Sequence, residues 1–252
     1  MQEINNILKE FNPISLEEMD RVKLLNRTDT KFIFNIKLLP SILDDLKDKY
    51  DVLEVNNKRY NDYQTLYFDN EELKSYKQHH NGKLNRIKVR FRKYIDSKIS
   101  FLEIKLKNNK GRTIKSRIQT NDIEEILLDS SKKFIEDNSD FNGDEIKPAL
   151  WNNFSRITLV HKTDNERLTI DMNLSFNLYN EEKDKKISHL IIAEVKQKKM
   201  LLESDFIKVM RKNHIRMSGM SKYCIGTALL NKKIKSNNFK ERILRIKKLK
   251  YA

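Results

Sequence analysis

The residues most able to do chemistry are basic side chains that recur at every second position. Four of them occupy the even positions of one short stretch: Arg86, Lys88, Arg90 and Arg92. The odd positions between them are apolar, and a period of two is typical of a β-strand, whose side chains alternate between its faces. After a short turn around Asp96 the alternation resumes, with Glu103, Lys105 and Lys107 on the polar face. The two segments therefore predict neighbouring strands that share a cationic face.

Such a run of like charges indicates an anionic ligand. The usual alternative for an alternating strand is a hairpin whose polar side lies in water. Exposed sheet faces generally mix the two signs of charge, because like charges opposite one another are destabilising. Two cations about 6 Å apart repel by roughly 3 kcal/mol at an effective dielectric constant of about 20. We therefore expect bound anions to offset this repulsion and the face to bind a polyanion.

Further strands with one charged and one apolar face are predicted along the chain. They span residues 26–35, 113–118, 154–161, 167–177 and 190–196, with a short strand at 65–69. Helices are predicted at 3–11, from Leu16, at 36–50, 70–79, 122–134, 203–212 and 223–231, and from Phe239 onward. If helices cover the apolar faces, the charged faces converge inside a closed sheet, which also removes exposed strand edges. The predicted fold is therefore α+β, an antiparallel closed β-barrel with helices packed outside.

Several local features lead to narrower predictions. Ser15 followed by Glu18 has the spacing of a capping box, which would start the helix at Leu16. In the predicted helix at 122–134, the buried stripe would be Ile123, Ile126 and Leu127. His79, His80 and His161 are expected to be structural. Cys224 has no nearby His or Asp pattern, so a nucleophilic thiol is not expected.

The composition limits the partners and the compartment. The 252 residues include 51 Lys plus Arg against 36 Asp plus Glu, and the formal net charge of +15 favours an anionic partner. No nucleic acid is expected, because such a surface would interleave exposed aromatic side chains with the basic ones. No apolar run approaches the roughly 20 residues needed to span a bilayer, and a single cysteine excludes an intramolecular disulfide. We expect a cytoplasmic protein whose membrane association, if any, is through its basic surface or a peripheral partner.

The sequence also predicts a single domain. It contains only 5 Gly and 3 Pro, and no linker or low-complexity segment separates the predicted elements. We therefore expect one domain over residues 1–252, with a core at about 20–230, N-terminal helices at 1–19 and a basic helical tail at 232–252. The tail is expected to be a solvated amphipathic helix, with nucleic-acid or membrane contact as the less favoured alternative.

Nine short motifs follow one another along the chain. They are RTDTKF at 27–32, LYFD at 66–69, RIKVRFRKY at 86–94, FLEIKLK at 101–107, KSR at 115–117, FSRIT at 154–158, RLTIDMNL at 167–174, AEVK at 193–196 and SKYCIG at 221–226. In this order the motifs resemble the VTC domain, the catalytic part of vacuolar transporter chaperone polyphosphate polymerases, within the triphosphate tunnel metalloenzyme superfamily. The resemblance covers about residues 20–230. It implies an antiparallel tunnel that binds a nucleoside triphosphate and inorganic polyphosphate, with Mn²⁺ or Mg²⁺ as cofactor.

The resemblance also implies roles for particular residues. The catalytic residues would be Lys31, Arg90, Arg92, Lys105, Arg156 and Arg167. The phosphate- or nucleotide-binding residues would be Arg27, Lys88, Lys115, Arg117, Lys196 and Lys222. The metal ligands would be Glu194 and Glu103. The structural alternative for each glutamate is a salt bridge with the lysine two residues later, and Asp171 could in the same way orient Arg167.

Two departures from the family pattern bear on activity. Hydrolytic members of the superfamily begin with Glu-x-Glu-x-Lys, whereas the matching face here is Arg27, Asp29 and Lys31, which lacks the first metal-binding carboxylate. Phe154 stands where the family often has a tyrosine, so this position has no hydroxyl. We therefore expect a polyphosphate polymerase that transfers the γ-phosphate of a nucleoside triphosphate, ATP in the first instance, to a polyphosphate chain. The alternatives are a tripolyphosphatase or nucleoside triphosphatase, and a non-catalytic receptor for polyphosphate or inositol phosphate.

Overall fold

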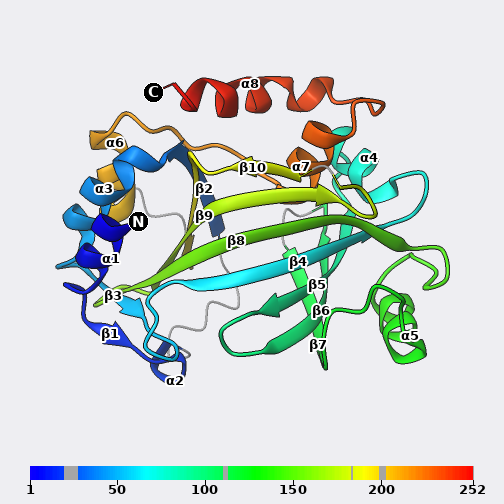
Figure 1. Cartoon of the computed structure of the whole chain (residues 1–252), viewed down its shortest axis with the longest axis horizontal. Coiled ribbons are helices and arrows are strands. Elements are labelled where there is room, and N and C mark those ends of the chain that lie inside the picture. The colour runs from blue at the N-terminus through cyan, green and yellow to red at the C-terminus, as the bar shows by residue number, and fades with distance from the viewer. Residues whose placement is uncertain (20–27, 110–112, 183, 199–202, 252) are drawn as a thin grey trace.

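A long, curved antiparallel sheet organises the molecule (Figure 1). The computed structural model describes residues 1–19, 28–109, 113–182, 184–198 and 203–251, so Arg27 lies outside the described residues. The main path of the 11-stranded sheet is β2-β11-β9-β8-β4-β5-β6-β7. Its strands are β2 (Thr28–Asn35), β4 (Asn61–Asp69), β5 (Arg86–Tyr94), β6 (Ile99–Lys107), β7 (Thr113–Thr120), β8 (Lys147–His161), β9 (Glu166–Leu178) and β11 (Leu190–Gln197). All neighbours on this path are antiparallel, which confirms the predicted α+β class with a large antiparallel sheet.

Three shorter strands join the sides of this path. β1 (Pro13–Ile14) pairs in parallel with β3 (Tyr50–Leu53), which is antiparallel to β8. β10 (Asp184–Ile187) is antiparallel to β9. None of these strands was predicted, because each is short and lacks a clear alternation of polar and apolar residues.

Helices lie around the sheet. They are α1 (Gln2–Leu8), α2 (Leu16–Met19), α3 (Leu39–Leu46), α4 (Lys74–His80), α5 (Asp129–Asn138), α6 (Asp205–Lys212), α7 (Lys222–Leu230) and α8 (Lys240–Leu249), with 3-10 turns η1 (Ile36–Leu38) and η2 (Asn237–Phe239). Within the described segments, no helix combines the length and the apolar character that a membrane span requires.

The predicted closure of the barrel is not confirmed. The path of hydrogen-bonded strands begins at β2 and ends at β7, and among the described residues these two edge strands do not pair with each other. The sheet is therefore a curved trough whose two edges are not joined by backbone hydrogen bonds. Side-chain alternation predicts which face a residue occupies, but it does not say whether the first and last strands of a sheet meet.

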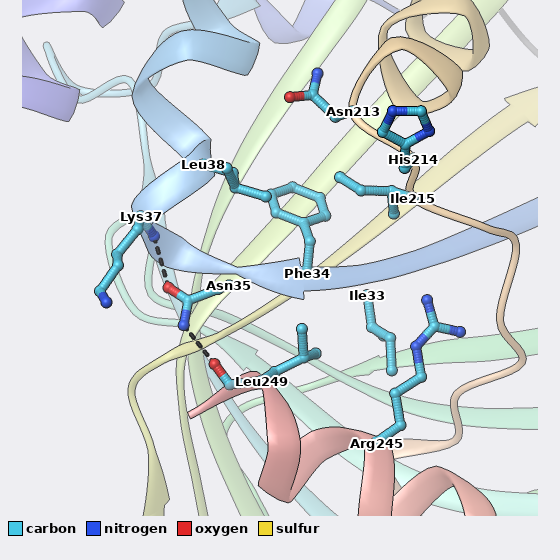
Figure 2. Close-up of a pocket in the computed structure, with 10 residues that line it drawn as sticks. All are labelled: Ile33, Phe34, Asn35, Lys37, Leu38, Asn213, His214, Ile215, Arg245 and Leu249. Atoms are coloured by element: carbon cyan, nitrogen blue, oxygen red, sulfur yellow. Dashed lines mark hydrogen bonds between the residues drawn. The ribbon is translucent and has the colours of Figure 1, made fainter. Parts of the chain in front are cut away.

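The basic tail helix α8 is amphipathic as expected, but it is docked on the molecule. Ile246 is 3% exposed and Phe239, just before the helix, is also buried. The side chain of Asn35, the last residue of β2, donates a hydrogen bond to the carbonyl oxygen of Leu249 (Figure 2). His189 Nε2 lies 3.0 Å from the carbonyl oxygen of Ile246. The apolar side of α8 is thus held over the end of β2.

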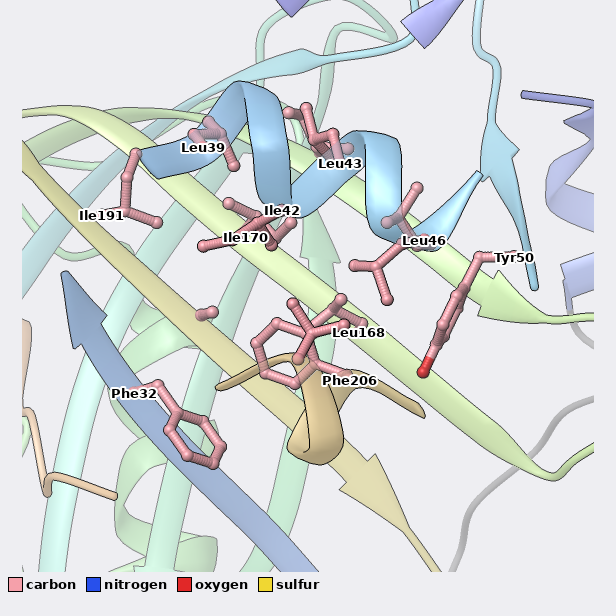
Figure 3. Close-up of a cluster of buried hydrophobic side chains, with 14 of the residues drawn as sticks. Phe32, Leu39, Ile42, Leu43, Leu46, Tyr50, Leu168, Ile170, Ile191 and Phe206 are labelled. Carbon is pink, nitrogen blue, oxygen red and sulfur yellow. The ribbon is translucent and has the colours of Figure 1, made fainter. Parts of the chain in front are cut away.

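One hydrophobic cluster covers the outer face of the trough over β8, β9 and β11. Figure 3 shows Leu39, Ile42, Leu43 and Leu46 of α3 packed over β9 and β11, with Phe206 of α6 beside them. Their spacing along α3 places all four on one helical face. The partners on the sheet are the apolar members of the alternating strands, among them Leu168 and Ile170. Since these residues point outward, the charged residues between them point to the concave face.

A bulge changes the character of the concave face towards one end. The register between β8 and β9 shifts between Asn153 and Ser155, and Asn173 on β9 has a positive φ of 55°. Such an extra residue reverses the alternation of side chains beyond it. Beyond the bulge Leu174 and Phe176 join a second cluster with residues of α7. The concave face is therefore charged along part of its length and apolar at one end.

Helix α7 fills this apolar end, in contrast to the expectation that helices pack only outside. Gly226 makes the close approach feasible, because a Cβ atom there would lie 2.5 Å from a ring carbon of Phe176 and 2.8 Å from a methyl carbon of Leu150. The hydroxyl of Tyr223 also donates a hydrogen bond of 2.6 Å to Asp69, the last residue of β4. These contacts fix the beginning of α7 next to the charged residues.

The local predictions have mixed outcomes. The capping box is confirmed, because Ser15 N donates to Glu18 Oε2 at 2.9 Å and Glu18 N donates to Ser15 Oγ at 3.2 Å. The predicted helix at 122–134 is wrong in position: α5 spans Asp129–Asn138, and Ile126 is 88% exposed. The side chain of Asp122 accepts a hydrogen bond from the backbone nitrogen of Ile123, a local bond that competes with helix formation.

Candidate functional site

A row of lysines crosses three strands on the concave face. Lys88 of β5 is opposite Lys105 of β6, and Lys105 is opposite Lys115 of β7. Lys88 Nζ donates a hydrogen bond to Ser221 Oγ at 2.8 Å, and burial lowers the pKa of Lys88. Nearby Arg90 and burial together hold the pKa of Lys105 well below its ordinary value. Because like charges opposite one another repel, this row is poised to bind an anion.

The next row contains the carboxylate that balances part of this charge. Glu103 is completely buried and accepts hydrogen bonds from Arg90 Nε at 2.8 Å and from Arg90 Nη2 at 2.6 Å. Lys115 forms an ion pair with its other oxygen. Burial opposes ionisation of Glu103, but the charges of Arg90, Arg92 and Lys115 hold its pKa well below the ordinary value. Glu103 therefore acts as the counter-charge of β5 and β7.

The side chain of Arg92 is buried and has few hydrogen-bond partners. It is 6% exposed, and its Nε donates one long hydrogen bond of 3.5 Å to Thr65 Oγ1. The guanidinium carbon lies 5.6 Å from the ring centres of both Tyr63 and Phe154. None of the carboxylates in the described segments forms an ion pair with it, and burial lowers its pKa. A guanidinium has five N–H donors, so Arg92 retains donors for an anionic ligand.

The second half of the trough presents a glutamate between two lysines. Glu194 on β11 is opposite Lys31 of β2 in the sheet, and the two side chains form an ion pair. The other oxygen of Glu194 is 3.0 Å from Lys196 Nζ, which also donates to Thr169 Oγ1 at 2.9 Å. Burial lowers the pKa of Lys196 to about 8. Burial opposes ionisation of Glu194, yet Lys196 and Lys31 keep its pKa well below the ordinary value.

Asp171 joins β8, β9 and α7. Arg156 donates to it twice, from Nε at 2.6 Å and from Nη2 at 2.9 Å, and Lys222 at the start of α7 forms an ion pair with the same carboxylate. Despite burial, these two cations lower the pKa of Asp171. Lys222 Nζ also lies 4.3 Å from the ring centre of Phe154, which stacks on Tyr63 with ring centres 5.0 Å apart. The charged region therefore has an aromatic wall.

The two halves of the trough face each other. Glu194 on β11 contributes to the pKa of Lys105 on β6, although four strands of the path lie between β11 and β6. Lys31 on β2 likewise contributes to the lowered pKa of Lys107 on β6. Charges influence one another to this extent only when they are near in space. The curvature of the sheet thus brings the charged faces together even though its edges are not paired.

The structure brings most of the predicted site residues into this region. They are Lys31, Lys88, Arg90, Arg92, Glu103, Lys105, Lys115, Arg156, Glu194, Lys196 and Lys222. Arg167 is opposite Lys196 in the sheet, and Arg117 is opposite Glu103 with its guanidinium carbon 4.5 Å from the ring centre of Phe101. Their functional roles stay predictions. Arg27 is outside the described residues.

Sequence reasoning missed several contacts. Asp171 binds Arg156 and Lys222, whereas orientation of Arg167 was the structural role expected for it. Tyr67, on the charged side of β4, accepts a hydrogen bond of 3.3 Å from Arg90 Nη1. Tyr63, Thr65 and Tyr67 alternate along β4, and this alternation could have predicted that Tyr67 lies on the charged face.

The imidazoles also differ from one another in their surroundings. His161 has the structural role expected of it, since its Nε2 lies 3.1 Å from Asp205 and its Nδ1 accepts from the backbone nitrogen of Asp164. His79 Nδ1, however, lies 3.2 Å from Cys224 Sγ, a proximity that the sequence did not reveal. Burial raises the pKa of the Cys224 thiol, which agrees with the expectation that it is not a nucleophile.

Among the described side chains, the carboxylate of Glu194 is the one that best fits a divalent metal ion. No group of three or more His, Cys, Asp and Glu side chains in the described segments is arranged to hold a metal. Glu194 nevertheless offers hard carboxylate oxygens next to the ammonium groups of Lys31 and Lys196. Mg²⁺ often takes one or two carboxylates and completes its shell with substrate phosphates and water. Glu194 would fit this way of binding Mg²⁺ if Lys31 and Lys196 turned from its carboxylate to the phosphate oxygens of a substrate. Glu103 is held by Arg90 and Lys115, and its assignment as a ligand stays a prediction.

The family model for the VTC domain matches residues 26–231. The chain belongs to the VTC domain family. This assignment confirms the resemblance based on the nine motifs. It also supports membership of a triphosphate-tunnel family. No curated protein matches the sequence.

Solved structures with a similar course of the chain are distant in sequence. A proposed adenylate cyclase from Vibrio parahaemolyticus is 11% identical, with a TM-score of 0.47 over 79% of this chain and 98% of that chain. A proposed adenylate cyclase from Bacillus halodurans is 12% identical, with a TM-score of 0.46 over 78% and 94%. A proposed adenylyl cyclase from Hippeastrum, which has a dominant triphosphatase activity, is 14% identical, with a TM-score of 0.46 over 79% and 94%.

Proposed function

We propose that this protein is a polyphosphate polymerase that transfers the γ-phosphate of a nucleoside triphosphate, such as ATP, to the end of an inorganic polyphosphate chain. The observation that carries the proposal is the imbalance of charge on the concave face. Arg92 and Lys105 have no ion pair with a described carboxylate, and both have lowered pKa values. Membership of the VTC domain family agrees with a phosphate ligand for these cations.

The reaction asks for positioning and neutralisation of charge. Phosphoryl transfer passes through a transition state whose charge is spread over the oxygens of the transferred group, so fixed cations supply most of the catalysis. Arg90 and Arg156 are each held by a carboxylate, so they are oriented before the substrate arrives. Arg92 and Lys105 lie next to these oriented arginines and have no ion pair with a described carboxylate, and we assign them to the transferred phosphate.

The attacking group is an oxygen of the terminal phosphate of the polyphosphate chain. It bonds to the γ-phosphorus while the bond from that phosphorus to the bridging oxygen breaks, and the nucleoside diphosphate leaves. The attacking oxygen carries no proton that must be removed at neutral pH, so the reaction needs no general base. Lys31, Lys196 and Lys222 can turn from their carboxylates to phosphate oxygens, because ammonium groups on flexible stems reorient easily. Glu194 would then hold Mn²⁺ or Mg²⁺, which when bound neutralises charge on the triphosphate oxygens.

The test is an analysis of products. Purified protein is incubated with ATP and Mn²⁺, with and without short polyphosphate as primer, and the phosphate products are separated by chain length. We expect acid-labile polyphosphate in excess of orthophosphate, and loss of both products in Arg92→Gln. Orthophosphate released in equal amount to the ATP consumed, with no chain formed under either condition, would favour the hydrolase. Binding of tripolyphosphate without any turnover would favour a receptor.

A further inference from the structure

Helix α8 lies beyond the residues that the family model matches, which end at 231. The segment before it is anchored on α4. Tyr76 donates a hydrogen bond from its hydroxyl to the carbonyl oxygen of Lys235 at 3.0 Å, and Asn238 Nδ2 donates to the carbonyl oxygen of His80 at 2.8 Å. The ring of Phe239 packs edge-on against His79, with centres 5.8 Å apart. The first turn of α8 is therefore held beside His79.

His79 connects this place to the charged trough. Its Nδ1 lies 2.9 Å from Lys88 Nζ, the first member of the lysine row. Burial and the positive charges of Lys88, Arg86 and Arg242 lower the pKa of His79 to about 3. The imidazole is therefore neutral at pH 7 in a strongly positive environment. Since Arg242 is on α8, the positive region of the trough extends to this helix.

The ends of β5 and β6 near His79 carry a second pair of like charges. Arg86 and Lys107 are opposite each other on β5 and β6. Burial, Arg86 and Lys31 lower the pKa of Lys107. In the described segments neither residue of this pair forms an ion pair with a carboxylate, and Arg86 donates only to the carbonyl oxygen of Lys83 at 3.3 Å. A bound anion would therefore relieve the repulsion between Arg86 and Lys107.

Two arginines of α8, Arg242 and Arg245, follow each other by about one helical turn and contact the rest of the molecule. The guanidinium of Arg242 is close to Gly219, whose added Cβ atom would lie 3.8 Å from Arg242 Nη2. Arg245 Nη2 lies 3.4 Å from the carbonyl oxygen of Arg216. Arg245 also lines a hollow of about 340 Å³ together with Ile33 of β2 (Figure 2), two residues beyond Lys31 on the same face of the strand. Both side chains are half-buried, whereas Lys247 and Lys248 of the same helix are exposed.

We propose that Arg86, Lys107, Arg242 and Arg245 form a second polyanion-binding segment, which holds the part of a long polyphosphate chain that extends beyond the trough towards α8. The inference rests on the proposed function for its choice of polyanion. Arg86, Lys107 and Arg242 all act on His79, which is next to Lys88, and Arg245 follows Arg242 by about one turn of α8. A short ligand such as tripolyphosphate would fill the lysine and arginine rows of the trough without reaching α8.

The test compares two double variants of α8 that remove the same charge. Arg242→Gln/Arg245→Gln removes the inward pair, and Lys247→Gln/Lys248→Gln removes the exposed pair. Affinities for long-chain polyphosphate and for tripolyphosphate are measured by calorimetry without nucleotide or metal, at several salt concentrations. For the inward variant we expect long-chain affinity to fall about tenfold, with a salt slope smaller by about 1 to 2, as expected for two lost phosphate contacts. Its affinity for tripolyphosphate should change by less than about twofold, since no contact to a short ligand is lost.

The outcomes separate this proposal from its competitors. Equal losses in the two double variants would overturn it, because they would reflect overall charge, and so would unchanged long-chain affinity in the inward variant. Arg242→Lys/Arg245→Lys, which keeps the charge, should recover most of the affinity and shows that the helix is still docked. If the inward variant instead loses only sedimentation with anionic phosphatidylglycerol vesicles, the surface binds membranes and the proposal is overturned. Because no turnover is measured, failure of the polymerase activity would not affect the result.

Discussion

Arg156 and Asp171, on neighbouring strands, form a two-pronged ion pair in which the carboxylate also receives Lys222 from α7. The pair is buried, so one carboxylate holds two cations in place and at the same time joins α7 to the sheet. Glu103 does the same on the other side of the trough, where it joins Arg90 and Lys115. Each carboxylate thus orients two cations and limits their mutual repulsion.

Asp171→Asn should destabilise the protein strongly. Removing one partner of a buried ion pair typically costs about 3–5 kcal/mol, because the remaining charge stays buried. For a domain of this size we expect the melting temperature to fall by roughly 10 °C, and tripolyphosphate should restore part of the loss by binding Arg156 and Lys222. Asp164→Asn, at an exposed carboxylate, serves as the control and should leave the melting temperature nearly unchanged. A melting temperature equal to that of the wild type would show that the pair has no structural role.

Glu194→Gln tests the metal position. The amide keeps the size of the side chain but loses the charge that attracts a divalent ion, so turnover with ATP and Mn²⁺ should fall by about 10² or more. The fold should persist at a lower melting temperature, because the amide oxygen can still accept a hydrogen bond from one of the two lysines and the side chain of Lys31 is partly exposed to water. Far-ultraviolet circular dichroism and product analysis check both points. Metal-dependent turnover at the wild-type rate would remove Glu194 from the site.

The sequence predicted the charged faces well because they depend on local alternation. Arg86 to Arg92 and Glu103 to Lys107 occupy the strand faces that a period of two assigns to them. The partners of Asp171 could not be predicted, since they depend on the register between β8 and β9 and on the position of α7. The sequence likewise did not predict that α7 enters the trough. It follows from the bulge at Asn173, which exchanges the inner and outer side chains of β9 without any clear signal in the sequence.

Tripolyphosphate should raise the melting temperature. A ligand that binds only the folded state at 100 times its dissociation constant stabilises by about 2.7 kcal/mol, which corresponds to several degrees for a domain of this size. In Arg92→Gln the shift should be clearly smaller at the same ligand concentration, because a charge-assisted contact worth about 1.5–3 kcal/mol is lost. Arg211→Gln on the exposed side of α6 is the matched control. The charged trough would not be the binding site if both variants shifted as much as the wild type.

Lys196 should make phosphate binding depend on pH. Burial lowers its pKa to about 8, so in the free protein its charge is lost as the pH rises through 8. A bound polyanion favours the ammonium form and raises this pKa, which means that binding takes up protons and that affinity falls above pH 8. The same lowered pKa has a second effect. Between about pH 8 and the ordinary value of 10.5 the folded protein binds fewer protons than the unfolded chain, so the contribution of Lys196 to stability rises with pH in that window.

Isothermal titration with tripolyphosphate from pH 7 to 9, in buffers of different ionisation enthalpy, measures both the affinity and the proton uptake. Lys115 has a pKa lowered to about 8 by burial, so it should contribute to the same transition. Lys196→Arg keeps the charge at all these pH values, and it should remove part of the proton uptake and flatten the fall in affinity. The double variant Lys196→Arg/Lys115→Arg should remove most of the proton uptake that remains in Lys196→Arg. Proton uptake in the double variant equal to that of the wild type would show that these two ammonium groups do not bind the phosphate.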